Sequence, residues 1–229
     1  MKFIKAVDEA SFVEMTTTKI LVDFQSILKN KDHINIAISG GNTPNAIFNK
    51  LVAFDFNGWE KVSFYWVDER FVPHDAADNN ANNALKILGN LPAKGFYRMR
   101  TDCVNADIAA VNHEKCLNEQ LPIINDFPQF DLILLGMGSD GHTASLFPNT
   151  DILEENEKTV ASVYVEKLGS YRVSLTYPTI LNASKRYVII GGGKETIIMQ
   201  VQDSNSNFKE YPIRKIMIEG NESDEYLHY

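Results

Sequence analysis

The chain of 229 residues is 44% hydrophobic and 23% charged, an ordinary globular composition, and it is long enough to bury a sizeable core. Its formal net charge of -8 argues against a general nucleic-acid binder, which needs basic patches. No apolar run approaches the length of a membrane span, and the N-terminus lacks the apolar core of a signal peptide. The two cysteines, Cys103 and Cys116, are expected to be reduced thiols in a cytoplasmic protein.

Helical and strand-like segments alternate along the chain. The expected elements, in order, are a helix beyond residues 16–18, a strand over 34–38, a helix after 44, a strand over 62–67, helices over 80–88 and 106–120, strands over 131–135, 160–165, 173–175 and 187–190, and a helix after 194. This order predicts one α/β domain over 1–229, with a mostly parallel, doubly wound Rossmann-like sheet and helices on both faces. The polar tail after Gly220 is expected to fray.

The most informative segment is the glycine-rich turn that follows the third predicted strand. It places an acid, Asp140, two residues before a base, His142. Gly136, Gly138 and Gly141 allow positive φ and leave space for a ligand. Because open α/β sheets bind ligands at the carboxyl ends of their strands, we expect a catalytic centre here.

Two other interpretations of this turn compete with catalysis. In the first, Asp140 and Thr143 merely cap the helix that follows. In the second, the glycines form a dinucleotide fingerprint, with Glu154 or Glu155 as the ribose-binding acid. Pro148 argues against the fingerprint, because it would interrupt the long helix that such a motif opens.

The loop after the strand over 34–38 is a candidate phosphate cradle. Thr43 is the expected N-cap of the next helix, and Pro44 its first residue. Free N–H groups at a helix start attract anions, although a tight turn would use the same residue types. The candidate binding residues of this loop are Ser39, Gly40, Gly41, Asn42 and Thr43.

Charged residues occur in three further segments. Asp68 and Arg70 come directly after the strand over 62–67, where Arg70 would be a fixed cation at the functional edge. Arg172 and Lys194 are candidates for binding a small dianion, with plain surface charge as the alternative for each. A cationic cluster in a protein of net charge -8 indicates a small phosphorylated metabolite.

Two familiar motifs are excluded. Residues 191–194 resemble a Walker loop, but Val188 stands where its first glycine is required and Glu195 replaces the Ser or Thr. His74 and the aspartates that follow it match no standard ligand set, so no metal is expected.

Several short motifs follow one another over roughly residues 35–200. They are S-G-G-N-T-P at 39–44, D-E-R-F-V-P at 68–73, the glycine-rich turn at 136–148, R-V-S-L-T at 172–176, L-N-A at 181–183 and G-K at 193–194. Together they resemble the motifs of the 6-phosphogluconolactonase family. Asn79 and Asn80 stand where that family commonly has Ser-Asn, and its usual C-terminal motif is not evident here. The resemblance implies hydrolysis of 6-phospho-D-glucono-1,5-lactone to 6-phosphogluconate in the oxidative pentose phosphate pathway, without a cofactor.

The resemblance also implies roles for individual residues. His142 would act as general base on water, Asp140 would orient it, and Arg70 would stabilise the oxyanion. Substrate or its phosphate would be bound by residues 39–43, Asp68, Gly138, Arg172 and Lys194. Ser145 is a less favoured nucleophile, because it lacks the G-x-S-x-G elbow. We expect a monomer or small homo-oligomer, with a small-molecule substrate and neither nucleic acid nor membrane as partner.

Two alternatives stay open for the same scaffold. Glucosamine-6-phosphate deaminases carry Tyr where this chain has Arg70, and a catalytic Glu where it has Phe147. Phe147 cannot transfer a proton, which favours the lactonase. A non-catalytic sugar-phosphate sensor would not need Asp140, His142 and Arg70 together.

Overall fold

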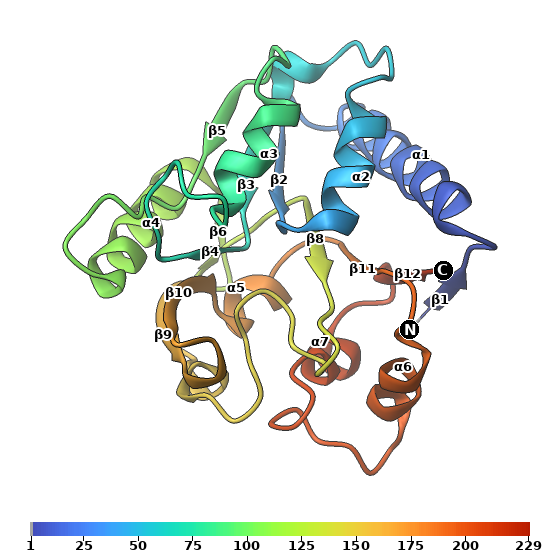
Figure 1. The fold of residues 1–229 in the computed structure, drawn as a ribbon. Coiled ribbons are helices and arrows are strands. Elements are labelled where there is room, and N and C mark those ends of the chain that lie inside the picture. Colours follow the sequence, from blue (N-terminus) through green and yellow to red (C-terminus); the bar gives the residue numbers. More distant parts are fainter. Residues whose placement is uncertain (1) are drawn as a thin grey trace.

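A seven-stranded sheet forms the centre of the computed structural model, which describes residues 2–229 (Figure 1). Its order is β1-β12-β11-β8-β2-β3-β5, and every neighbouring pair is parallel. The strands are β1 (Lys2–Lys5), β2 (Ile34–Ile38), β3 (Val62–Trp66), β5 (Gly95–Tyr97), β8 (Leu132–Gly136), β11 (Arg186–Ile190) and β12 (Glu225–His228). The expected α/β class with a parallel sheet is confirmed.

Alternate side chains of the central strands enter two separate cores. In β8, Leu132 and Leu134 join one core, whereas Ile133 and Leu135 join the other. Both faces are therefore covered, which explains why the strands are continuous apolar runs instead of alternating ones.

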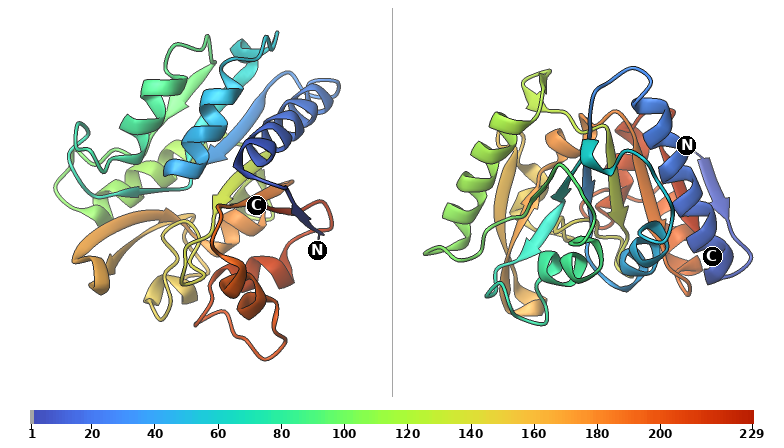
Figure 2. Two further views of the ribbon diagram at one scale, coloured as in Figure 1. Left: turned by 45° about the vertical axis from the view of Figure 1, so that its right-hand side comes forward. Right: turned by 90° about the horizontal axis from the view of Figure 1, so that it is seen from above.

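Helices cover both faces of this sheet (Figures 1 and 2). On the first face lie α1 (Glu9–Ile27), α2 (Asn42–Leu51) and α3 (Asn80–Leu88); on the second lie α4 (Ala106–Gln120), α5 (Tyr177–Leu181), α6 (Glu195–Gln202) and α7 (Ile213–Glu219). Single helical turns are η1 (Trp59–Lys61), η2 (Asp151–Glu154) and η3 (Glu166–Leu168). Within residues 2–229, none of these helices is long and apolar enough to cross a membrane.

A second, antiparallel sheet packs on the same side as α4. It consists of β4 (Asp68–Arg70), β10 (Ser170–Leu175) and β9 (Val160–Val165), in that order, and a small hairpin pairs β6 (Ile123–Ile124) with β7 (Phe127–Pro128). Asp68 and Arg70, which follow the strand predicted over 62–67, form a short strand of their own, because they pair with the edge of β10. This pairing sets Arg172 directly opposite Arg70.

Two expected helix starts are wrong. The first helix begins at Glu9, where Asp8 caps it by accepting from Ser11 N–H, and not beyond residues 16–18. The second is capped by Gly41, at φ 114°, and not by Thr43. Gly41 reaches this backbone conformation without strain, so the helix begins earlier than the Thr-Pro pair indicated.

The prediction that the tail after Gly220 frays is also wrong. The tail forms β12, which is inserted between β1 and β11 with Tyr226 and Leu227 buried. The sequence of β12 is short and begins with a charged residue, so its apolar content did not mark it as a strand. Asp224 anchors its start by accepting from the buried Arg186 side chain at 2.8 Å.

The winding of the chain creates a crevice between β2 and β8. From β2 the chain proceeds outward through β3 to β5, and then returns to β8 and proceeds the other way to β11 and β12. The loops at the carboxyl ends of β2 and β8 therefore separate toward opposite sides. Such a topological switch point is where open α/β sheets bind their ligands.

Candidate active site

A pocket of about 230 Å³ lies at this switch point. Its walls come from the loops after β2, β3, β8 and β11. The residues predicted for the site that line it are Ser39, Gly40, Gly41, Asn42, Thr43, Asp68, Arg70, Gly138, His142 and Lys194. Asp140 contacts His142, and Arg172 is paired with Arg70 across two antiparallel strands, but neither of these two predicted residues is part of the wall.

The turn after β8 brings Asp140 and His142 into direct contact. His142 Nδ1 lies 2.5 Å from Asp140 Oδ1. The turn closes on itself, since Gly138 N–H donates to the His142 carbonyl at 2.8 Å and Gly141 N–H donates to the Gly138 carbonyl at 3.1 Å. No helix follows; residues 143 and 146 form an isolated bridge instead. With Nδ1 engaged by the carboxylate, Nε2 is the ring nitrogen left for a ligand in the pocket.

Gly138 is required by this close approach. A Cβ on Gly138 would lie 2.1 Å from the His142 ring at both Nδ1 and Cε1. Gly141 is required for a different reason, because its φ of 74° is costly for other residues. Glycine therefore serves two distinct purposes within four residues of chain.

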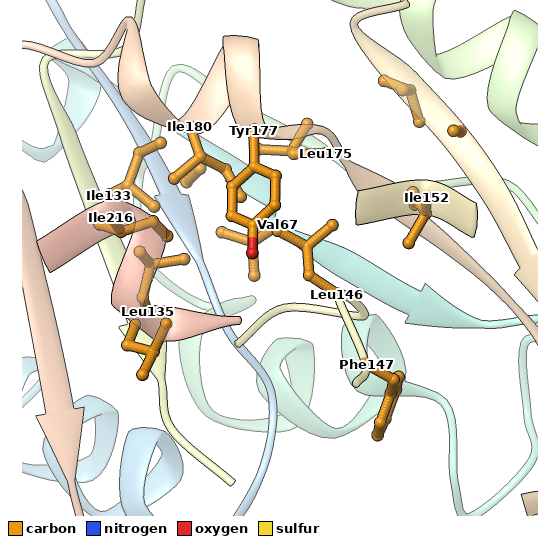
Figure 3. Close-up of a cluster of buried hydrophobic side chains, with 14 of the residues drawn as sticks. Val67, Ile133, Leu135, Leu146, Phe147, Ile152, Leu175, Tyr177, Ile180 and Ile216 are labelled. Atoms are coloured by element: carbon orange, nitrogen blue, oxygen red, sulfur yellow. The ribbon is translucent and has the colours of Figure 1, made fainter. Parts of the chain in front are cut away.

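One face of the His142 imidazole is covered by Phe147. The two ring centroids are 4.2 Å apart, with an interplanar angle of 27°. Phe147 itself is fixed, since it is only 6% exposed and follows Leu146, which lies among the buried apolar side chains shown in Figure 3. The histidine thus has a carboxylate at its edge and an apolar ring on its face.

Burial lowers the pKa of His142 from its usual 6.5 to about 4. Asp68 acts in the opposite direction, and the cations Lys194 and Arg172 add to the lowering. The imidazole is therefore neutral at physiological pH and can accept a proton.

Asp68 and Arg70 are both held by their neighbours. Asp68 accepts from the Ser145 hydroxyl at 2.7 Å, and burial raises the pKa of its carboxyl. Arg70 Nη1 donates to the Asp78 carbonyl at 2.7 Å, which fixes the guanidinium at the pocket wall. The Ser145 hydroxyl is buried and committed to Asp68, which argues against its use as a nucleophile.

The loop after β2 presents the start of α2 to the pocket. Ser39 acts as a structural link here, because its hydroxyl donates to the Leu134 carbonyl and accepts from Gly136 N–H. A Cβ on Gly40 would collide with the Asn80 side chain at 2.1 Å, so the glycine lets the two loops touch. The first N–H groups of any helix lack intrahelical partners and can hold an anion.

Lys194 reaches the pocket from the far side, after β11. Its ammonium donates to the Met137 carbonyl in the glycine-rich turn. Burial lowers the pKa of Lys194. The lysine thus joins the loop after β11 to the loop after β8, with its charge at the pocket.

Sequence reasoning missed two residues of the site. Asn80 lines the pocket from the start of α3, where its amide donates to the Asp68 carbonyl. Lys167, in η3, forms an ion pair with Asp140 across 27 residues of chain. No local pattern marks such a pair, because it depends on how the β9–β10 hairpin sits over the turn.

Buried Glu69 joins two segments of the pocket wall, β4 and the start of α3. It accepts from the N–H groups of Asn80 and Ala81, at the start of α3, and from that of Arg70. Burial raises its pKa to about 7. The carboxylate therefore ties the strand that carries Asp68 and Arg70 to the helix that carries Asn80.

This fold and pocket define an α/β protein with a pocket at a topological switch point of its sheet. A family model described as glucosamine-6-phosphate isomerases/6-phosphogluconolactonase matches residues 7–225. The chain therefore belongs to that family.

Individual relatives agree with this assignment. A 6-phosphogluconolactonase from Nostoc sp. is 31% identical over 220 residues, which cover 93% of this chain and 90% of the relative. One from Synechocystis sp. is 35% identical over 190 residues, covering 81% and 78%. The crystal structure of a 6-phosphogluconolactonase from Shewanella baltica shares the fold, with a TM-score of 0.88 at 23% identity, covering 100% of this chain and 98% of that one.

Proposed function

We propose that this protein is an enzyme that hydrolyses 6-phospho-D-glucono-1,5-lactone to 6-phosphogluconate, a step of the oxidative pentose phosphate pathway. Two findings support this activity. The chain belongs to the family, and relatives named 6-phosphogluconolactonase are similar to it over most of both chains. The single observation that carries the chemistry is the contact between His142 Nδ1 and Asp140, which orients the imidazole and leaves its Nε2 for the pocket beside a helix start.

His142 would act as the general base. Its Nε2 takes a proton from water while the water oxygen bonds to the lactone carbonyl carbon. When the tetrahedral intermediate collapses, the bond from that carbon to the ring oxygen breaks, and the protonated imidazole returns its proton to the ring oxygen. Asp140 stabilises the transient imidazolium and keeps the ring in the required orientation.

Arg70 would stabilise the negative charge that develops on the carbonyl oxygen. Its guanidinium is fixed by the Asp78 carbonyl, so it need not reorganise during the reaction. Asp68 lies beside it in the pocket wall, where its carboxyl can accept from a sugar hydroxyl. Gly138 contributes space and a backbone position next to the base.

The phosphate of the substrate would lie at the start of α2. The N–H groups of the loop from Gly40 to Thr43 and the ammonium of Lys194 can hold a dianion there. Arg172 is the cross-strand neighbour of Arg70 and is not part of the wall, so it would act through its charge and not by contact. Binding energy at this remote end orients the reacting carbonyl.

The proposed test uses freshly generated lactone, with its spontaneous hydrolysis subtracted, beside an assay for ammonia release from glucosamine 6-phosphate. Lactone loss above background that disappears in His142→Ala supports the lactonase. Ammonia release in place of lactone loss contradicts it and favours a deaminase. Binding of 6-phosphogluconate with neither reaction would favour a sensor.

The proposal extends to domain organisation, oligomeric state, cofactors and cellular location. We propose that residues 1–229 act as one domain, as a monomer or small homo-oligomer, without metal, organic cofactor or nucleic acid. We place the enzyme in the cytoplasm, which the two free cysteines, Cys103 and Cys116, support.

A further inference from the structure

Lys167 lies at the tip of the β9–β10 hairpin, outside the pocket wall. Its Nζ pairs with Asp140 Oδ2, while Asp140 Oδ1 contacts His142 Nδ1. Asp140 is therefore shared, with one oxygen for the base and the other for the lysine. The hairpin and the glycine-rich turn are joined at this carboxylate.

A second set of contacts joins the same groups on their other side. Lys167 Nζ lies 4.8 Å from the centroid of the Phe147 ring, within the range of a cation–π contact. Phe147 in turn stacks on the His142 imidazole at 4.2 Å. Lysine, carboxylate, imidazole and phenyl ring thus form a closed circuit, in which Lys167 is the one member that comes from the hairpin.

We propose that Lys167 is a positioning residue of the reaction. It holds Asp140 in the orientation that His142 requires, and it compensates the negative charge of the Asp140 carboxylate. This inference rests on the proposed function, since it gives His142 the part of the base. Without Lys167, nothing else in the circuit fixes Oδ2, and the orientation of the carboxylate depends only on the contacts of Oδ1 with the His142 ring and backbone N–H.

The charges around His142 determine the sign of the effect. Asp140 and Asp68 favour the imidazolium, whereas Lys194, Arg172 and Lys167 oppose it. Removal of the Lys167 charge leaves the Asp140 carboxylate uncompensated. The imidazolium is then better stabilised, so the pKa of His142 rises.

The test compares Lys167→Met, which keeps an apolar stem over Phe147, with Lys167→Arg, which keeps the charge. The readouts are the NMR titration of the His142 imidazole without substrate, and the kcat and KM for lactone hydrolysis. In Lys167→Met we expect the titration midpoint to rise by about 0.5–1 pH unit. We expect kcat to fall about tenfold, equivalent to about 1.4 kcal/mol, with KM within about twofold. Lys167→Arg should have the titration midpoint and the kcat of the unmodified protein.

Lys158→Met is the matched control, because Lys158 is an exposed lysine two residues before β9 that pairs with Glu155 and not with the site. It should leave the titration and kcat unchanged. If Lys167→Met fails to fold, Lys167→Gln takes its place in the same comparison. An unchanged midpoint and kcat in a folded, charge-free variant would overturn the proposal, as would a folded Lys167→Arg that restores neither.

Failure of the proposed function is distinguishable from failure of this inference. The imidazole titration needs no turnover, so a shifted midpoint in a protein that does not hydrolyse the lactone supports the Lys167 circuit and rejects the lactonase. If the wild-type protein hydrolyses the lactone but Lys167→Met changes neither the midpoint nor kcat, the lactonase is supported and the Lys167 circuit is rejected.

Discussion

The Phe147 ring lies nearly parallel to the His142 imidazole, with the ring centroids 4.2 Å apart. This is the position at which the resemblance to deaminases would require a glutamate that transfers protons. An apolar ring at this distance cannot do so; it excludes water from one face of the imidazole and favours its neutral form. The stack therefore suits a site with a single base, which is what lactone hydrolysis needs.

Replacing the base should remove catalysis and preserve binding. We expect His142→Ala to lower kcat by about 10²–10⁴-fold, the usual contribution of general-base catalysis. Binding of 6-phosphogluconate, measured by calorimetry, should change little, because the start of α2 and Lys194 are untouched. Near-normal turnover in this variant would refute the role of His142.

The rate of the enzyme should fall on acidification only well below the usual titration range of histidine. Burial keeps the pKa of His142 near 4, and the base is active when deprotonated. The value of kcat/KM should therefore rise through about pH 4 and be flat from about pH 5.5 upward. The measurement is a pH profile corrected for spontaneous lactone hydrolysis at each pH. A midpoint near 6.5 would mean that the imidazole is solvated as in a model peptide.

A methyl group on Gly138 should displace the base. The new Cβ would lie 2.1 Å from the His142 ring, so either the ring or the turn must move. We expect Gly138→Ala to lower kcat by at least about 100-fold, because misplacement by about 1 Å can have that effect. Gly136→Ala is the matched control, since its Cβ would meet no atom within 4 Å. Equal activity of the two variants would contradict this explanation.

Lys194→Ala should act mainly on substrate binding. Loss of a cation at the phosphate end removes an interaction that is equally strong in the ground state and the transition state. We expect KM to rise about tenfold or more with a small change in kcat, in steady-state kinetics. Lys86→Ala on the exposed face of α3 provides the comparison. An unchanged KM would remove Lys194 from the phosphate site.

Asp224→Ala should destabilise the fold without touching the pocket. Arg186 is fully buried, and Asp224 accepts from both its backbone N–H and its Nε. Removing the carboxylate leaves a buried charge without its counter-ion, which costs about 3–5 kcal/mol. Urea unfolding measures this loss, with exposed Glu222→Ala as control. A loss below about 1 kcal/mol would mean that water reaches Arg186.

The sequence predicted the four central strands of the sheet, β11, β8, β2 and β3, and most of the residues that line the pocket, because both depend on local patterns. Runs such as 34–38 and 160–165 are strands with those bounds, and the loops that follow central strands do converge on one pocket. Parallel strands point their carboxyl ends the same way, so the position of a motif after a strand is enough to place it at that edge.

What could not be predicted depends on contacts between distant segments. The strand at Asp68 exists only because β10 pairs with it. Likewise, β12 is a strand because it pairs with β1 on one side and with β11 on the other. Lys167 reaches Asp140 through the path of a hairpin, and Arg172 is set beside Arg70 by strand register. Single-sequence periodicity contains none of this information.

The place of β12 also determines the order in which the molecule can be completed. β1 is an edge strand whose partner in the sheet is β12, and the side chains of Lys2 and Glu225 meet across 223 residues of chain. During synthesis the first strand must therefore wait, unpaired, until the last one has been made. Contacts of such sequence separation form late and slowly. The interval before closure is when this chain is most exposed to mispairing with another copy of itself.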